Sequence, residues 1–327
     1  MNKKWKIIIS ITISLLLIII MLESIIIYSI IDYYTDYISS KDKFYKWAYI
    51  DKSGNQKTRL EFFEASSFSE GLAAVSISNS SPIKYGFIDT SRILKIESSF
   101  NQVGFFSEGK APVLRSGLFW SYIDASGNEV INTDFCTAHS FSDSLAQVSN
   151  FYADFAYIDH RGNKVIELDS SISFADDFFE GLASIEVNDK WGFINKKEEI
   201  VIPPQFDFTW KFSEGYAYVI KDNKTGFIDK NGEIKIPLKY ESAYSFHEGL
   251  AAVKIKGKWG FINKKDEIVI EPKFQNVEIF SEGLAPFKKN RLWGYIDRQG
   301  NIVIKPRFKR VGLFKDGYAP VQFEILY

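Results

Sequence analysis

The chain has 327 residues, and its 40 Lys+Arg against 41 Asp+Glu give a formal net charge of −1. This balance excludes a nucleic-acid binder that works through bulk positive charge. One cysteine and three histidines exclude a disulfide scaffold and a cysteine-rich metal centre, and we expect neither a metal nor another cofactor.

The first predicted element is a transmembrane helix over residues 7–31, a stretch in which Glu23 is the only charged residue. Its 25 residues exceed the roughly 20 that a bilayer core requires. The preceding tail, residues 1–6, is basic, and residues 32–46 form a predicted juxtamembrane linker. The helix is therefore expected to act as an uncleaved signal anchor.

The charges that flank this segment predict its orientation. Lys3, Lys4 and Lys6 precede it, and Asp32 and Asp36 follow it. The positive-inside rule then leaves the N-terminus in the cytoplasm and the rest of the chain outside, as a single-pass membrane protein.

A cleaved signal peptide is the alternative interpretation of the same segment. Its apolar core would cover residues 7–22, followed by the polar pair Glu23 and Ser24. The sequence shows no small-x-small cleavage site there, and the apolar run resumes at Ile25. Cleavage would leave a secreted protein.

Two short motifs recur eight times after the linker. The first is aromatic–small–aromatic–Ile–Asx, as in residues 259–263, and the second is Phe-Ser-Glu-Gly-Leu-Ala or a variant, as in residues 280–285. Both motifs step by 34 residues through the last four units, which indicates a tandem array. The array covers residues 47–327, divided into repeats 47–84, 85–119, 120–154, 155–190, 191–224, 225–258, 259–292 and 293–327.

Each repeat is predicted to hold three short strands, because the alternation of large and small residues has a period of two and no helical period appears. In the seventh repeat these are residues 258–262, residues 267–270 before Pro272, and a strand that begins at residue 284. An Asx–Gly turn joins the first two strands. Arg92, Glu198 and Asp266 replace that glycine in three repeats and predict looser hairpins there.

The predicted fold class is all-β, with two possible shapes for the array. A closed propeller-like ring often interleaves its first and last strands. This chain begins with first-strand residues at Trp47 and ends with third-strand residues at Tyr327. That phasing favours an open solenoid, and the closed ring is the alternative.

The repeat resembles the WG-repeat family, named for its Trp-Gly pair. The resemblance is best in residues 190–206, 258–274 and 292–308, where W-G-[FY]-I-[ND] runs on to I-V-I-x-P-x-F, and it covers nearly all residues after Tyr45. Departures from the pattern occur at Ala48, Ser121, Ala156 and Thr225. The resemblance implies a β-repeat module found mostly in bacterial proteins, often at the cell surface, with no catalytic residues to transfer.

The reactive residue types have ordinary interpretations. Cys136 and His139 lie in a variable segment between strands, without a visible orienting partner or oxyanion site. His160 and His247 are single deviations within a turn and within the second motif. We therefore predict no catalytic site and no enzyme.

An acidic residue precedes the glycine position of the second motif in all eight repeats. A calcium ladder is one interpretation, but each repeat supplies a single acid and calcium requires six to eight oxygens. A hydrogen bond that stabilises the turn is the simpler role. The eight residues are Glu70, Glu108, Asp143, Glu180, Glu214, Glu248, Glu282 and Asp316.

Most tryptophans occur once per repeat, which favours a core position for residues such as Trp191 and Trp259. Trp210 differs, because it lies in the variable segment of a single repeat. It is the candidate for an exposed, ligand-stacking aromatic.

Charge is divided along the array. Residues 61–180 hold seven basic and seventeen acidic side chains, whereas residues 286–327 hold nine basic and three acidic ones. The basic far end of the array, including Arg307, Lys309 and Arg310, is a candidate surface for an anionic cell-wall polymer. A solvated surface without a function is the simpler interpretation.

These observations predict a non-enzymatic, membrane-anchored, extracytoplasmic repeat protein that acts as a binding or interaction scaffold at the bacterial cell surface. Its partner is an unknown protein or an anionic cell-wall polymer. The alternative function is a carbohydrate or cell-wall polymer binding module.

Overall fold

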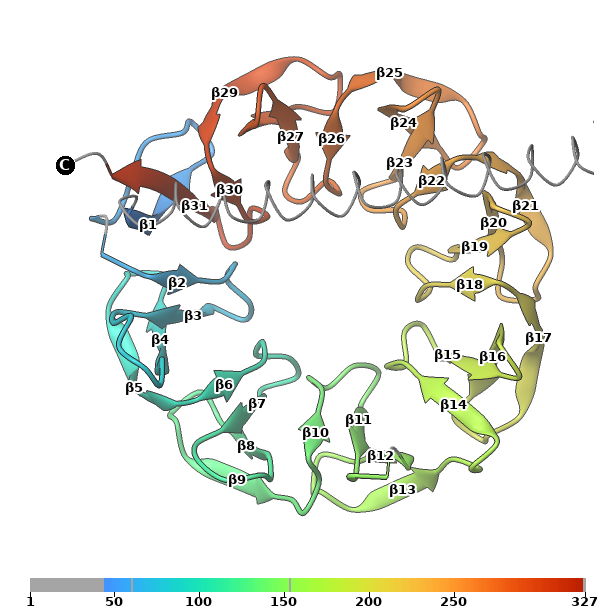
Figure 1. Ribbon diagram of the computed structural model, residues 1–327, viewed down its shortest axis with the longest axis horizontal. Helices are drawn as coiled ribbons and strands as arrows, with labels where there is room; N and C mark the ends of the chain where they lie inside the picture. The colour runs from blue at the N-terminus through green and yellow to red at the C-terminus, as the bar shows by residue number, and fades with distance from the viewer. Residues whose placement is uncertain (1–43, 60, 153, 326–327) are drawn as a thin grey trace, which may run out of the picture. The chain divides into compact units, whose positions relative to one another are not determined.

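Antiparallel sheets repeat around a ring in the computed structural model of the chain (Figure 1). The structure describes residues 44–59, 61–152 and 154–325, and apart from the first two residues of β1 (Phe44–Asp51) and the last two of β31 (Tyr318–Ile325) the strands belong to the unit Lys46–Phe323. None of the described residues belongs to a helix that could cross a membrane. The predicted tail and membrane segment, residues 1–31, and residues 32–43 of the predicted linker lie outside the described residues, and the last three linker residues, 44–46, belong to strand β1.

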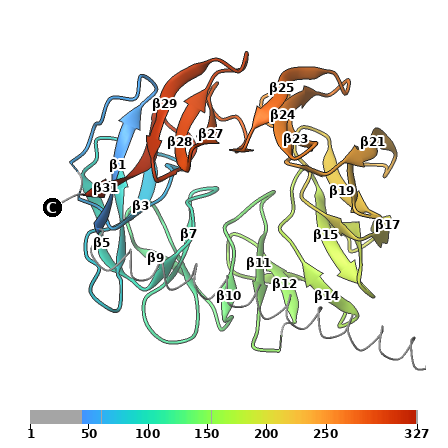
Figure 2. The same cartoon turned by 45° about the horizontal axis from the view of Figure 1, so that its top comes forward.

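Seven sheets have four strands each, in sequence order, and each forms one blade (Figure 2). The first strand of a blade is short, and the fourth is the outermost in the ring. The strands of blades 1 to 3 are β2 (Glu64–Ala65), β3 (Leu72–Ser76), β4 (Tyr85–Asp89) and β5 (Leu94–Phe100); β6 (Gln102–Val103), β7 (Ala111–Leu114), β8 (Ser121–Ile123) and β9 (Glu129–Asn132); and β10 (Thr137–Ala138), β11 (Ala146–Ser149), β12 (Phe155–Ile158) and β13 (Lys164–Glu167).

Blades 4 to 7 repeat the same order, and their second and third strands are longer than those of blades 2 and 3. Their strands are β14 (Ile172–Ala175), β15 (Leu182–Val187), β16 (Lys190–Asn195) and β17 (Ile200–Phe206); β18 (Phe208–Thr209), β19 (Ala217–Lys221), β20 (Lys224–Ile228) and β21 (Ile234–Tyr240); β22 (Ser242–Ala243), β23 (Leu250–Ile255), β24 (Lys258–Asn263) and β25 (Ile268–Phe274); and β26 (Asn276–Val277), β27 (Ala285–Lys289), β28 (Leu292–Ile296) and β29 (Ile302–Phe308).

The eighth sheet joins the two ends of the repeat array. It consists of β30 (Arg310–Val311), β31 (Tyr318–Ile325) and β1 (Phe44–Asp51), in the order β1-β31-β30. This closing blade makes the array a ring, so the open solenoid favoured by the sequence is wrong and the closed alternative is what the chain forms.

The error came from where the repeat was divided. The second motif supplies the second strand of a blade and the first motif supplies the third, and they pair as one hairpin, with Ala251 opposite Ile262 in blade 6. A chain that begins with a third strand and ends with a second strand therefore completes one blade. Each four-stranded blade also has one strand more than the three predicted. It is the short first strand, which is formed by the segment before the second motif.

The hydrophobic core lies between adjacent blades. In the pair formed by blades 6 and 7, Trp259, Phe261 and Phe274 of one blade pack with Phe280 and Phe287 of the next. The glycine of the first motif allows the strands to approach, since a Cβ atom on Gly260 would lie 2.5 Å from the carbonyl oxygen of Ile270. The once-per-repeat aromatics therefore fill the interfaces between blades.

The turns between third and fourth strands close in one way throughout the ring. Asp51 accepts the backbone N–H groups of Ser53 and Asn55, and Gly54 has a φ of 81°. At the same position Arg92, Glu198 and Asp266 adopt φ angles of 66°, 65° and 64°. The looser hairpins predicted at these three residues are therefore wrong, because non-glycine residues adopt the same left-handed conformation.

The Glu-Gly turn of the second motif links each blade to the next. Glu248 and Gly249 both have positive φ angles, 54° and 76°, as a two-residue hairpin turn requires. The carboxylate of Glu248 then accepts the N–H of Gly283 in the following blade, with N···O distances of 3.0 and 3.2 Å. Arg298, from the same following blade, lies 3.9 Å from this carboxylate.

The same link occurs at every boundary between blades, and we call the set the carboxylate belt. The predicted hydrogen-bonding role of the acids is confirmed, although each bond crosses to the next blade. The donors are the backbone N–H groups of Gly109 to Glu70, Ser144 to Glu108, Gly181 to Asp143, Gly215 to Glu180, Gly249 to Glu214, Gly283 to Glu248, Gly317 to Glu282, and Gly71 to Asp316.

Removal of one belt carboxylate should destabilise the ring, because a charge-assisted hydrogen bond is lost and a partly buried amide is left without its acceptor. For Glu248→Ala we expect a loss of about 1–3 kcal/mol in the free energy of unfolding, measured by urea unfolding. The control is Glu271→Ala, at an exposed residue of β25, with an expected change within about 0.5 kcal/mol. Equal changes in the two variants would contradict the role of the belt.

Candidate interaction surface

Trp210, the aromatic that the sequence singled out, lies at the surface of blade 5. It is 41% exposed, whereas Trp259 at a core position is 7% exposed. Its indole stacks on the ring of Phe208 at 25°, with 6.2 Å between ring centroids. The predicted exposure of Trp210 is confirmed.

Trp210 is the end of a continuous row of aromatic rings across three blades. Successive centroids lie 5.9 Å apart from Phe155 to Phe174, 5.3 Å from Phe174 to Trp191, and 5.1 Å from Trp191 to Phe208. Phe174 is 39% exposed, and Phe155, Trp191 and Phe208 are half-buried. We call these five residues the aromatic row.

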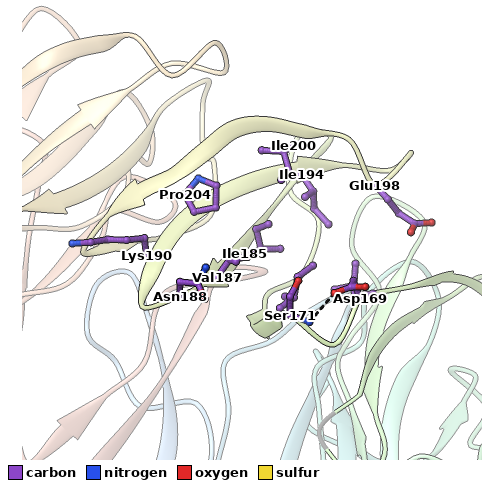
Figure 3. A pocket seen from close by; sticks show the side chains of 12 residues that line it. Asp169, Ser171, Ile185, Val187, Asn188, Lys190, Ile194, Glu198, Ile200 and Pro204 are labelled. Carbon is purple, nitrogen blue, oxygen red and sulfur yellow. Dashed lines mark hydrogen bonds between the residues drawn. The ribbon is translucent and has the colours of Figure 1, made fainter.

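A groove between blades 3 and 4 adjoins the aromatic row (Figure 3). It has a volume of about 500 Å³ and a largely apolar lining that includes Leu168, Ile172, Ile185 and Ile200. A smaller hollow of about 260 Å³ shares Leu168 and Ile172 and extends to Phe155, the first ring of the row.

Polar groups lie at the rim of this groove. Asp169 accepts the backbone N–H of Ser171 at 2.8 Å, the contact drawn in Figure 3. Hydrogen bonds from the Ser171 side chain and backbone lower the pKa of the Asp169 carboxyl. Lys190 and Glu198 provide one charge of each sign. An apolar floor with a few fixed polar groups is the usual composition of a ligand or peptide site.

The segments before the Glu-Gly turns line a cavity of about 1000 Å³ to which blades from across the ring contribute. Asp177, Lys211 and Lys315 are among its charged residues. Lys211 directly follows Trp210, and its amine lies 3.7 Å from the centroid of the Phe179 ring. Burial lowers the pKa of Lys211.

His139 belongs to this central cavity and does not pair with Cys136. Its Nδ1 lies 3.0 Å from Asp177 Oδ1, and this hydrogen bond raises the pKa of the imidazole. Cys136 donates to the carbonyl oxygen of Ser149 at 3.4 Å. His139, Asp176 and Asp177 offer ligand atoms within 4.8 Å of one another, and the Nδ1 atom of His139 is already hydrogen-bonded to Asp177.

The three basic candidates near the C-terminus lie beside the closing blade. The Arg307 guanidinium donates to the carbonyl oxygen of Gly54 at 2.6 Å, so it joins blade 7 to the closing blade. Arg310 is exposed at the start of the closing blade, and the half-buried Lys309 precedes it. Because the array is a ring, these residues do not form the far end that an open array would have.

The sequence did not identify Phe155, Phe174 and Phe208 as parts of a surface. Phe155 occupies the tryptophan position of its repeat, for which once-per-repeat spacing favours the core. Phe174 and Phe208 are extra aromatics in the variable segment, as Trp210 is. That shared location was the available signal, but only the packing of neighbouring blades brings the rings together.

Comparisons with known proteins identify the repeat. A family model described as WG containing repeat matches eight segments: residues 47–79, 85–119, 120–150, 155–191, 191–224, 226–259, 259–293 and 293–324. No curated protein is significantly similar to the chain in sequence.

Solved structures are similar to the chain at low sequence identity, one of them with a TM-score above 0.5. A eukaryotic initiation factor is 9% identical over 82% of this chain and 82% of its own, with a TM-score of 0.51. Apo AztD from Citrobacter koseri is 11% identical over 86% and 98% of the two chains, with a TM-score of 0.49. BamB from Moraxella catarrhalis is 12% identical over 79% and 90%, with a TM-score of 0.46.

Alanine substitutions at two tryptophans should separate core from surface. Trp259→Ala removes a ring that stacks on Tyr244 at 4.9 Å in the core, with an expected loss of about 3–5 kcal/mol. Trp210→Ala should cost about 1 kcal/mol, because much of its surface is already in water. Urea unfolding measures both values, and large, equal losses would contradict the distinction.

Proposed function

The chain belongs to the WG containing repeat family, and we propose that it is a non-enzymatic interaction scaffold held at the outer face of the bacterial cell membrane. The aromatic row is the observation that supports binding. It presents Phe174 and Trp210 to solvent beside an apolar groove, and exposed aromatic surface of this kind is typical of interaction sites.

The proposed partner is a protein that inserts apolar side chains into the groove between blades 3 and 4. A volume of about 500 Å³ accommodates a few side chains, and the row extends the contact over blade 5. Trp and Tyr are the residues that most often dominate binding energy at such interfaces. Lys190 and Glu198 at the groove rim would then fix the orientation of the partner.

The proposed membrane location depends on the sequence before the repeats. The apolar stretch of residues 7–31 is long enough for one span, and the lysines before it place the N-terminus inside. The repeats would then meet partners outside the cytoplasm. Secretion after cleavage of the segment is the competing outcome.

Protease added to intact cells that produce the full chain should digest the repeats and spare an N-terminal tag. The basic tail should keep the N-terminus in the cytoplasm, so that the repeats are exposed to the protease outside the cell. Antibodies against the tag and against the repeats measure the two halves separately. Full protection of the repeats would contradict the extracytoplasmic location, and a mature N-terminus near Ser24 would replace the anchor with a secreted form.

A second candidate function is the binding of a carbohydrate or cell-wall polymer. The stacked pair of Phe208 and Trp210, 6.2 Å apart, favours it, because sugar rings pack on exposed aromatic faces. The partner would then contact the end of the row in blade 5, away from the apolar groove.

Photo-crosslinking in whole cells tests both candidates. A photoreactive residue at position 210 should give a specific adduct, whereas the same residue at position 130, which is also exposed but lies on the outer strand of blade 2, should not. Phe174→Ala removes a ring from the aromatic row in blade 4, one blade away from Trp210. It should reduce the adduct at position 210 several-fold if a protein covers the groove.

The chemistry of the adduct distinguishes the two partners. Protease should remove the added mass of a protein partner, and polysaccharide hydrolase should remove that of a glycan. Equal adducts at positions 210 and 130 would contradict a binding role for the aromatic row.

A further inference from the structure

A second groove lies between blades 6 and 7, and its chemistry differs from that of the first. It has a volume of about 430 Å³ and contains the side chains of Lys258, Lys273, Lys288 and Lys289. Gln275 and Asn290 supply its other polar side chains, and the residues described as lining it include no Asp or Glu. We call it the lysine groove.

The four amines of the lysine groove have no carboxylate within ion-pair distance among the residues that the structure describes. Lys273 and Lys288 lie over aromatic rings instead, with 5.3 Å from the amine to the Phe274 centroid and 5.6 Å to the Trp293 centroid. Lys239, at another boundary between blades, pairs with Asp266. The groove therefore holds an uncompensated cluster of positive charge.

A comparison of the repeats shows which position holds an acid in other blades but not beside the lysine groove. In blade 4, Lys190 pairs with Asp207 at 2.7 Å. Lys258 occupies the same position as Lys190 two blades later, and the residue that corresponds to Asp207 is Gln275. The blade between them has an acid, Glu241, at this position. An acid is thus compatible with the fold at this site and is missing where the lysines gather.

We infer that the lysine groove binds a polyanion that carries phosphate groups. Lysine ammonium groups are compact point charges and are common phosphate ligands. Four of them, from strands β24, β25 and β27, spread over one open cleft, which suits several charges along a chain better than one small ion. The amide groups of Gln275 and Asn290 add hydrogen-bond donors for phosphate oxygens.

This inference goes beyond the proposed scaffold function, because the aromatic row lies on blades 3 to 5 and the lysine groove on blades 6 and 7. It also differs from the basic surface suggested by Arg307, Lys309 and Arg310, of which none lines the groove. A phosphate-bearing wall polymer and a free polyphosphate share the required chemistry.

The direct test is to restore the missing acid. The full chain in detergent micelles is titrated with fluorescently labelled inorganic polyphosphate, and Gln275→Glu is compared with the wild type. The new carboxylate should lower the positive charge of the groove beside Lys258 and should repel phosphate. We expect binding to weaken about fivefold or more and to weaken further with salt.

A matched control carries the same change in charge elsewhere. Ser126 is exposed in a blade 2 turn at a variable position, so Ser126→Glu should fold and bind as the wild type does. A second variant, Lys258→Gln with Lys288→Gln, should weaken binding as much as Gln275→Glu. Circular dichroism verifies that each variant is folded.

Four results would overturn the inference: no binding of polyphosphate by the wild type, equal weakening by Gln275→Glu and Ser126→Glu, unchanged binding in the double lysine variant, or equal affinity for polyglutamate. Competition by a phosphodiester wall polymer but not by orthophosphate would identify the polymer as the source. Trp210→Ala should leave polyphosphate binding unchanged, and Gln275→Glu should leave the adduct at position 210 unchanged, so the two proposals fail separately.

Discussion

The hydrogen bond from the amide of one Glu-Gly turn to the carboxylate of the preceding turn is the contact on which the ring depends. Its donor and its acceptor both lie in turns with two consecutive left-handed residues, such as Glu248 and Gly249. The link from Gly71 to Asp316 joins the first blade to the last. Since no blade lacks a neighbour, the two ends of the array have to share one sheet, and β1 and β31 do so.

Local structure was readable from the sequence because it depends on residues within one repeat. Alternating residues predicted the strands, Asx and glycine predicted the turns, and regular spacing assigned Trp259 to the core. The closure of the ring was not readable, because a period of 34 residues does not show where one blade ends. Curvature depends on how the aromatics of neighbouring sheets pack, as Phe261 does on Phe280 at 4.8 Å, and an open stack has the same sequence pattern.

The candidate surface was predictable only in part for a similar reason. Trp210 stood out because a single repeat contains it, and its neighbour Phe208 lies in the same repeat. The row continues through contacts that cross blade boundaries, Trp191 to Phe208 and Phe155 to Phe174, which one repeat does not reveal. Arg307 is a residue that the sequence suggested as part of a surface but that has a structural contact instead. Its charge suggested a ligand surface, whereas its guanidinium reaches the backbone of Gly54 in the next blade. In a ring of repeats, a surface side chain can contact residues of the adjacent blade, and the sequence of its own repeat does not show these contacts.

The repeats contain two kinds of position. Some hold the same type of residue in every repeat and link the blades, and others hold a different side chain in each repeat. The belt acid is present in every repeat, so its loss would weaken the link between two blades whichever ligand the protein binds. The position that holds Asp207 in one repeat holds Glu241, Gln275 and Lys309 in the next three, and no belt bond involves it. A change of one side chain there alters the charge of a groove while the strands and the belt remain in place. Sites of different chemistry, such as an apolar groove and a lysine groove, can therefore coexist on one ring at little cost in stability.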